Sequence, residues 1–246
     1  MTNAPLASIA IILVEPQFPG NIGMVCRAMK NMGLSQLRLV AGCNHLDSEA
    51  FKFAVAAGDL LEQAACYKSL TEALADITTS IATTRRSGKY RQELLTPPQA
   101  AQALLQQSGT TALVFGREDH GLSTADLSLC TLQATIPSSV ELGSLNLAQA
   151  VLIFCYELFN TAVHNPATPL RTPVASGDLE PLFGHMSATL QRIGYLNPQN
   201  PEHIMRTLRR ILFRAELDQR ELAVLRGMFS QIDWASGNFS ERKRQP

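Results

Sequence analysis

Short apolar runs alternate with amphipathic stretches along the first two thirds of the chain. The apolar runs predict strands, most of them buried, at Ile9–Val14, Gln36–Val40, Ala65–Tyr67, Thr78–Thr83, Thr111–Phe115 and Leu132–Ile136. The stretches between them predict helices at Met24–Met32, Ser48–Ala57, Leu70–Asp76, Pro97–Gln107 and Leu145–Phe159. Strands and helices that alternate at this spacing indicate an α/β fold, with a mainly parallel sheet covered by helices on both faces.

The pattern changes at residue 164. Residues 164–177 contain three prolines and show no periodicity, which is typical of a linker. The amphipathic stretches that follow predict three helices, at Asp178–Gly194, Pro201–Arg214 and Asp218–Gly237. We therefore expect a main domain over residues 1–163, a linker over 164–177 and a helical extension over 178–246. An extension of this size needs support from the main domain or from a partner subunit.

The composition is that of a globular protein. Hydrophobic residues make up 46% of the chain and charged residues 17%, which argues against global disorder. No uninterrupted apolar run reaches the roughly 18 residues that cross a membrane, and the N-terminus lacks the basic region of a secretion signal. The five cysteines are scattered and form no C-x-x-C pair, and the five histidines do not cluster. We expect reduced, mostly buried thiols, a cytoplasmic protein and no metal.

The net charge of zero hides an uneven distribution. Residues 1–163 hold 10 Lys and Arg against 13 Asp and Glu, whereas residues 164–246 hold 11 against 8. The basic excess of the second part favours a nucleic-acid contact there, although a solvated surface would show the same imbalance.

Three segments carry candidate chemistry. Gly116 follows a predicted strand, where glycine lets a ligand approach the backbone, and the Glu118 carboxylate can accept hydrogen bonds from hydroxyls or an amine. Asn146 lies at a helix start and is a poor helix former, so we expect it to have a bonding partner. Arg27 follows Asn21 near another helix N-terminus, where it could hold an RNA phosphate or a developing oxyanion. The alternatives are a plain turn at Gly116, a helix cap before Asn146, and an exposed arginine without function at Arg27.

Two basic clusters fit RNA as well as they fit a solvated surface. Cations bracket Tyr90 in the loop that follows Thr84, a combination that suits single-stranded RNA. In the extension, arginines recur every four residues on one helix face, which is either a row of phosphate contacts or an ordinary amphipathic surface. The other face of that helix is apolar and predicts buried side chains at Ile204, Leu208, Ile211 and Leu212. The two clusters are Arg85, Arg86, Lys89 and Arg91, and Arg206, Arg210 and Arg214.

The order and spacing of these motifs resemble the SpoU branch of the SPOUT RNA methyltransferases. The matching motifs are Gly-Asn-Ile-Gly from Gly20, Phe-Gly-Arg-Glu from Phe115 and Ser-Leu-Asn-Leu-Ala from Ser144. The resemblance covers about residues 8–160, and the extension fits the bacterial tRNA 2'-O-methyltransferases of the anticodon loop. It implies a C-terminal trefoil knot, a homodimer, S-adenosylmethionine as cofactor, and methylation of the ribose 2'-hydroxyl of tRNA nucleotide 32, a cytidine or uridine.

The resemblance also implies roles for individual residues. Arg27 and Asn21 would handle the target ribose and its phosphate, Glu118 would orient the substrate or motif loops, and Asn146 would complete the site. Because a guanidinium stays protonated in proteins, we expect Arg27 to stabilise the 2'-oxygen rather than to remove its proton. The methyl donor would lie among Thr83, Thr84, Arg85, Gly116, Ile136, Gly143, Ser144 and Leu145. The RNA would contact Arg86, Lys89, Arg206, Arg210 and Arg214.

Two alternatives stay open at this point. A related enzyme with the same chemistry could act on ribosomal RNA or on another tRNA position. A non-catalytic RNA-binding protein could also have kept the fold, but it would be expected to lack Arg27 or Asn146, and both are present.

Overall fold

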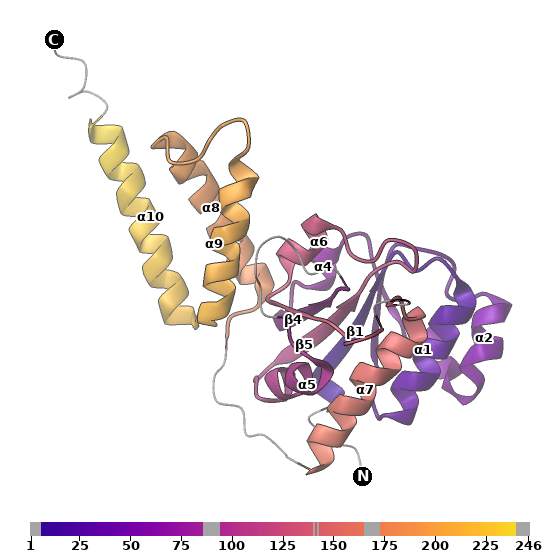
Figure 1. The fold of residues 1–246 in the computed structure, drawn as a ribbon. Helices are drawn as coiled ribbons and strands as arrows, with labels where there is room; N and C mark the ends of the chain where they lie inside the picture. The colour runs from indigo at the N-terminus through magenta and orange to yellow at the C-terminus, as the bar shows by residue number, and fades with distance from the viewer. Residues whose placement is uncertain (1–5, 86–93, 140, 142, 165–172, 240–246) are drawn as a thin grey trace.

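The computed structural model describes residues 6–85, 94–139, 141, 143–164 and 173–239. Its centre is a six-stranded sheet in the order β3-β2-β1-β5-β4-β6, in which every strand pair is parallel (Figure 1). The predicted parallel α/β sheet is confirmed, and only the last strand is shorter than expected. The strands are β1 (Ile9–Val14), β2 (Gln36–Val40), β3 (Ala65–Tyr67), β4 (Ile77–Thr83), β5 (Thr110–Phe115) and β6 (Leu132–Ala134).

Seven α-helices and two short 3-10 turns belong to the described part of the main domain. Helices α3 and α6 span only five and six residues, too few for their periodicity to appear in the sequence. The helices are α1 (Pro19–Asn31), α2 (Ser48–Ala54), α3 (Gly58–Glu62), α4 (Leu70–Ala73), α5 (Pro97–Leu105), α6 (Thr124–Leu129) and α7 (Leu147–His164), and the turns are Leu6–Ser8 and Val55–Ala57.

Two helix starts in the main domain differ from the prediction. Helix α1 begins at Pro19 rather than at Met24, because proline has a helical φ and its missing N–H costs nothing in a first turn. Asn21 therefore lies inside the helix rather than in a loop before it. Helix α7 begins at Leu147 rather than at Leu145, so Asn146 precedes the helix, where its side chain caps the Ala148 N–H.

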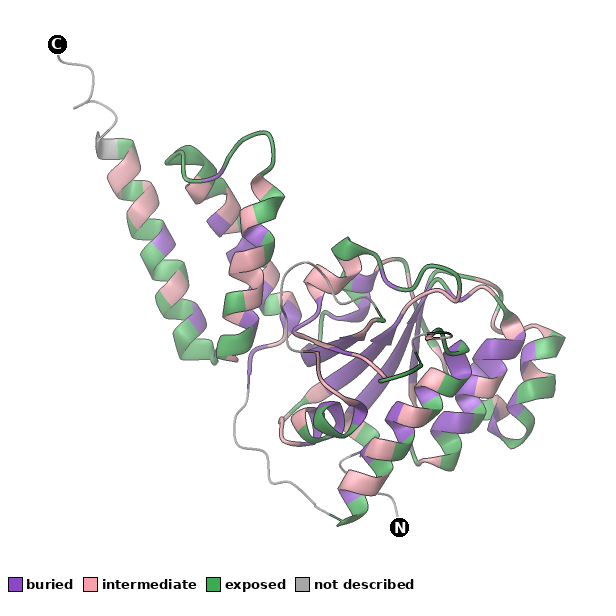
Figure 2. Cartoon of the chain, viewed as in Figure 1, coloured by how far each residue is buried: buried purple, intermediate pink, exposed green. Residues whose placement is uncertain are grey.

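Successive strand residues face opposite layers of helices. Ile9, Ile11 and Leu13 of β1 belong to the core under α1, α2, α3, α5 and α7, whereas Ile12 and Val14 belong to the core under α4 and α6. Figure 2 shows that the strands are buried throughout the centre of the sheet. A sheet covered on both faces leaves its strand ends as the places where polar side chains reach solvent.

Helix α7 is long and apolar enough to cross a membrane by length and composition alone. In this structure it packs on α1 and α5, and Val151, Phe154, Cys155 and Leu158 are buried in the main core. That packing is typical of a core helix in a globular domain.

The described part of the extension forms the three predicted helices, and these share a hydrophobic core. They are α8 (Ser176–Arg192), α9 (Pro201–Ala215) and α10 (Gln219–Phe239), and they pack around Phe183, Met205, Phe213 and Phe229. The Gly177 N–H donates to the Ala75 carbonyl over 3.0 Å, and a Cβ at Gly177 would lie 2.6 Å from that oxygen. The Gln107 amide also donates to Glu216 over 2.8 Å. The bundle therefore rests on the main domain, while residues 165–172 of the predicted linker lie outside the described residues.

All five cysteines are free thiols. Cys26, Cys130 and Cys155 are buried, and that burial raises the pKa of each thiol to about 12. Cys43 is half-buried and only Cys66 is exposed. Because the thiolate is the reactive form, the three buried thiols are inert near neutral pH. This agrees with the expectation of reduced, mostly packed cysteines.

Candidate functional site

The candidate site lies at the carboxyl ends of the strands, where β1 and β5 lie side by side. From β1 the chain continues to β2 and β3 on one side, while β5, β4 and β6 lie on the other. The chain order therefore switches direction between β1 and β5, and ligands in open α/β sheets bind in the crevice at such a point. The loops after β1, β4, β5 and β6 meet the start of α7 there.

A pocket opens at this edge of the sheet. The loops after β4, β5 and β6 line it together with the segment before α7. It contains every residue predicted for the methyl-donor site: Thr83, Thr84, Arg85, Gly116, Ile136, Gly143, Ser144 and Leu145. Segments far apart in the sequence thus form one cavity.

Two glycines shape the pocket wall. A Cβ at Gly116 would lie 2.2 Å from the Gly121 carbonyl carbon and 2.3 Å from the Leu122 nitrogen, so the loop can fold back on itself only with glycine there. At Gly143 a Cβ would lie 3.4 Å from the Arg85 Cδ. Gly116 is therefore required by the fold of its loop, whereas a Cβ at Gly143 would lie farther from its neighbours.

Three of the four predicted catalytic residues form one chain of hydrogen bonds. The Asn146 Nδ2 donates to the Asn21 Oδ1 over 3.0 Å, and the Asn21 Nδ2 donates to the Glu118 Oε1 over 2.8 Å. The other carboxylate oxygen of Glu118 accepts from the Gln17 N–H over 3.0 Å. We call Asn146, Asn21 and Glu118 the amide–carboxylate chain. It joins α7, α1 and the loop after β5, and Glu118 also lines the pocket.

The local sequence fixes the two amides in this chain. Asn21 is only 8% exposed and is held in the first turn of α1, next to Pro19. The Asn146 Oδ1 accepts from the Ala148 N–H over 2.9 Å, which leaves its Nδ2 to donate to Asn21. Each amide thus has one possible orientation, because donors and acceptors alternate along the chain.

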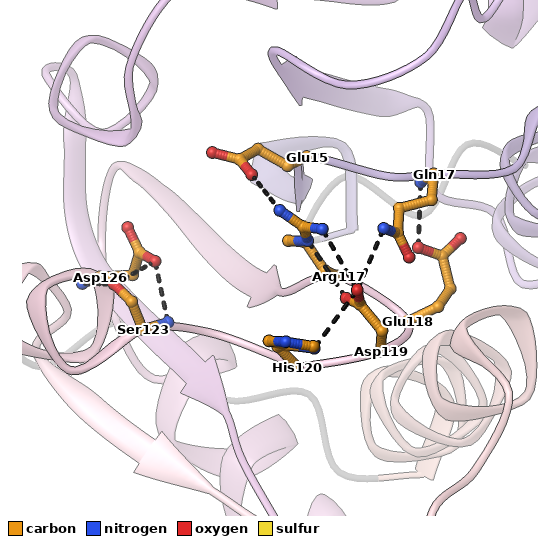
Figure 3. A network of polar contacts seen from close by, with 8 residues as sticks. All are labelled: Glu15, Gln17, Arg117, Glu118, Asp119, His120, Ser123 and Asp126. Carbon is orange, nitrogen blue, oxygen red and sulfur yellow. Dashed lines mark hydrogen bonds and ion pairs between the residues drawn. The ribbon is translucent and has the colours of Figure 1, made fainter.

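A second polar network includes Arg117, Asp119 and His120, which line the pocket (Figure 3). The sequence favours a turn with a solvated salt bridge for Arg117 and Asp119, and the structure contains this pair. Arg117 pairs with Glu15 and with Asp119, each over 3.1 Å, and Gln17 donates to Asp119 over 3.2 Å. The hydrogen bond from Arg117 holds the pKa of the Asp119 carboxyl below its usual value. Glu15 has a left-handed φ of +49°, which turns the chain sharply after β1. Glu15 and Gln17 lie outside the motifs, so their part in this network could not be predicted.

Figure 3 also shows how the loop after β5 ends. The Ser123 hydroxyl accepts from the Asp126 N–H over 3.1 Å, and Asp126 accepts from the Ser123 N–H over 3.0 Å. This capping box starts α6 and anchors the far end of the loop that carries Glu118.

The remaining predicted residues that the structure describes are not among those that line the pocket. Arg27 is exposed on α1 and makes no hydrogen bond or ion pair with any described residue. Arg86 and Lys89, like Tyr90 and Arg91, lie outside the described residues. Arg206 and Arg214 are exposed on α9 and Arg210 is half-buried. Among the described residues, neither Arg27 nor the three arginines of α9 contact the amide–carboxylate chain.

Arg209 differs from its neighbours on α9. Both of its terminal nitrogens donate to Glu180, over 2.6 and 2.8 Å, and its guanidinium lies 4.2 Å from the centre of the Phe183 ring. It is therefore a packing residue between α8 and α9. Ile211, expected on the buried face of the helix, is 45% exposed.

No group of three or more His, Cys, Asp and Glu residues that could hold a metal occurs among the described residues. The site offers hydrogen-bonding amides, the carboxylates of Glu118 and Asp119, and a cavity shaped by glycine. Such a set can position a hydroxyl next to a bound small molecule.

Two family models match the chain over separate ranges. The SpoU rRNA Methylase family matches residues 8–156, and the C-terminal domain of the tRNA methyltransferase TrmJ matches residues 177–245. The first range holds the pocket and the amide–carboxylate chain, and the second holds the helical bundle.

Similar proteins match over nearly the full length. The tRNA (cytidine/uridine/adenosine-2'-O-)-methyltransferase TrmJ of Pseudomonas aeruginosa is 36% identical, covering 97% of this chain and 98% of its own. The tRNA (cytidine/uridine-2'-O-)-methyltransferase TrmJ of Escherichia coli K12 is also 36% identical, covering 96% and 100%. The crystal structure of TrmJ from Z. mobilis ZM4 superposes with a TM-score of 0.81 at 37% identity, covering 91% and 98%.

Proposed function

We infer the function from the family: this chain belongs to the SpoU methylase family and, within it, to the TrmJ tRNA (cytidine/uridine-2'-O-)-methyltransferases. We propose that it modifies nucleotide 32 in the tRNA anticodon loop. The TrmJ match over the extension and the full-length TrmJ relatives argue against ribosomal RNA as the substrate. The target position itself rests on the resemblance of the motifs.

The amide–carboxylate chain is the observation that carries this proposal. It places two amides and one carboxylate, with a fixed orientation, at the rim of the glycine-walled pocket. A ribose offers hydroxyls that both donate and accept, and these groups can hold it at the pocket mouth. A catalytic rather than a purely RNA-binding role follows, since binding alone does not require such a chain beside a cavity.

S-adenosylmethionine is the proposed cofactor, and its sulfonium supplies the methyl group. The pocket fits a bound small molecule because loops from four parts of the chain enclose it, and the close turn at Gly116 shapes one of these loops. When bound, the donor would supply the methyl group that replaces the proton of the 2'-hydroxyl and would leave as S-adenosylhomocysteine, and the proton would leave to solvent or to the RNA. Arg27 would stabilise the negative charge that develops on the oxygen, while Asn21, Glu118 and Asn146 would align the ribose.

We also propose that the protein is a cytoplasmic homodimer. Leu152, Tyr156, Phe159 and Val163 lie on one side of α7 and are between 38% and 51% exposed. A stripe of apolar side chains on the surface favours a protein–protein contact. A dimer would also explain why Arg27 lies outside the pocket of its own chain, because a partner subunit could bring its arginine to the site. The trefoil knot stays a prediction of the resemblance.

Donor binding gives a first prediction. S-adenosylmethionine or S-adenosylhomocysteine should raise the melting temperature of the wild type, because a ligand that binds the folded state stabilises it. The Gly116→Ala substitution should remove most of this shift, since its Cβ would collide with backbone 2.2 Å away. Gly184→Ala is the matched control, because nothing lies within 4 Å of a Cβ there. Calorimetry that detects ATP or NAD binding but neither donor compound would contradict the cofactor assignment.

The target position gives a second prediction. Purified enzyme, tRNA and labelled donor should yield one 2'-O-methyl group at nucleotide 32, and mass mapping of tRNA from a deletion strain should show the same position unmodified. A methyl group missing at another position would contradict nucleotide 32 but leave the family assignment intact.

A further inference from the structure

We propose that the Phe18 ring stacks on the base of the target nucleotide and so holds its ribose against the amide–carboxylate chain. This inference rests on the proposed function and adds a substrate-binding residue that the motifs do not contain. No described hydrogen bond or pocket contact involves the Phe18 side chain.

The position of Phe18 is fixed by the site itself. The residue before it, Gln17, donates its N–H to Glu118, and the carbonyl of Phe18 accepts from the Asn21 N–H over 3.0 Å. Pro19 follows and begins α1. The Phe18 carbonyl is therefore bonded to Asn21 and the residue before Phe18 is bonded to Glu118, so a ligand held by the amide–carboxylate chain lies near Phe18.

The side on which Phe18 lies points to the RNA rather than to the methyl donor. Glu118 and Leu145 line the pocket, whereas Asn21 and Phe18 do not. Asn21 is the middle member of the amide–carboxylate chain, and Phe18 precedes it by three residues, outside the set of residues that line the pocket. A nucleoside whose ribose contacts the chain from outside would bring its base toward Phe18.

The exposure of the Phe18 ring indicates that the ring binds a partner. Phe18 is 57% exposed although it is a large aromatic residue on a rigid backbone segment. Proteins that act on single-stranded RNA stack unpaired bases on such rings, at little entropic cost because few torsions are immobilised. Stacking also tolerates different bases, because every base has a π-face. This tolerance agrees with the names of the two TrmJ relatives, of which one includes adenosine and the other does not.

Steady-state kinetics on an anticodon stem-loop test the proposal. Phe18→Ala should raise the KM for RNA about tenfold or more, the loss expected for one stacked base, with the melting shift caused by the donor unchanged. Phe18→Trp should retain near wild-type activity, whereas Phe18→Leu should behave like Phe18→Ala because leucine keeps apolar area but cannot stack. Leu46→Ala, which truncates another apolar residue of the main domain that is 50% exposed, is the control and should change nothing.

An abasic substrate identifies the stacked base. If Phe18 stacks on the target base, removing that base should raise the KM of the wild type for RNA about as much as Phe18→Ala does. It should not raise the KM of the Phe18→Ala enzyme any further. Two outcomes would overturn the assignment. In the first, the losses of RNA binding from Phe18→Ala and from the missing target base add up; in the second, the effect of Phe18→Ala disappears only when a neighbouring base is removed. A Phe18→Ala enzyme as active as wild type would overturn the inference, while a wild type that methylates no tRNA would instead overturn the proposed function.

Discussion

Replacing Arg27 with alanine should lower methyl transfer by about 10²–10³-fold, the loss typical of one group that stabilises a developing oxyanion. Folding should be unaffected, because Arg27 is exposed and no described residue bonds to its side chain. Donor affinity should also be unchanged, because Arg27 is not among the residues that line the pocket of its own chain. Single-turnover assays with saturating tRNA measure the chemical step, and thermal shifts measure donor binding.

Two further variants make this test specific. Arg27→Lys should remain poor, because lysine keeps the charge but lacks the planar fork that binds an oxyanion or phosphate at two points. Lys68→Ala removes an exposed cation from the end of the edge strand β3, away from α1, and should retain full activity. Wild-type rates with Arg27→Ala would exclude the electrostatic role and leave the amide–carboxylate chain as the whole site.

The strands could be predicted because their residues face two cores. Ile9–Val14 is apolar at all six positions, and a run of that length is too short for a buried helix. The polar residues that follow β5 were therefore predictable as site residues. Their mutual contacts were not, because the hydrogen bonds among Asn21, Glu118 and Asn146 span 97 and 125 positions. Only the resemblance to a family placed these three residues in one site.

Helix α9 shows where a periodic pattern stops being informative. Arg209 and Arg210 are neighbours in the sequence, yet Arg209 is bound by Glu180 and Phe183 of α8, while Arg210 has no described partner. The difference depends on how α8 crosses α9, which the sequence of one helix does not contain. The same crossing leaves Ile211 on the surface, although the apolar stripe predicted it to be buried.

Replacing Arg206, Arg210 and Arg214 together with glutamine should weaken tRNA binding at physiological salt about tenfold or more. The main domain carries more acidic than basic residues, so a basic element must attract the RNA, and these three arginines lie on one helix without described ion pairs. Because phosphate contacts release counterions, removing each arginine that binds a phosphate should also lower the slope of log affinity against log salt by about one. Filter binding over a salt series measures both quantities.

The matched control removes the same charge from elsewhere in the bundle. Arg192 pairs with Asp233, Arg226 donates to the Asp178 carbonyl, and Arg220 is exposed at the start of α10, so this second triple variant tests net charge alone. Substitution is cleaner than truncation, because removing the bundle would also remove the contacts of Gly177 and Glu216 with the main domain. If both triple variants lower the slope equally, the bundle attracts tRNA only through its overall charge. An unchanged slope in the α9 variant would exclude phosphate contacts there, and the segment from Arg85 to Arg91 would become the next one to test.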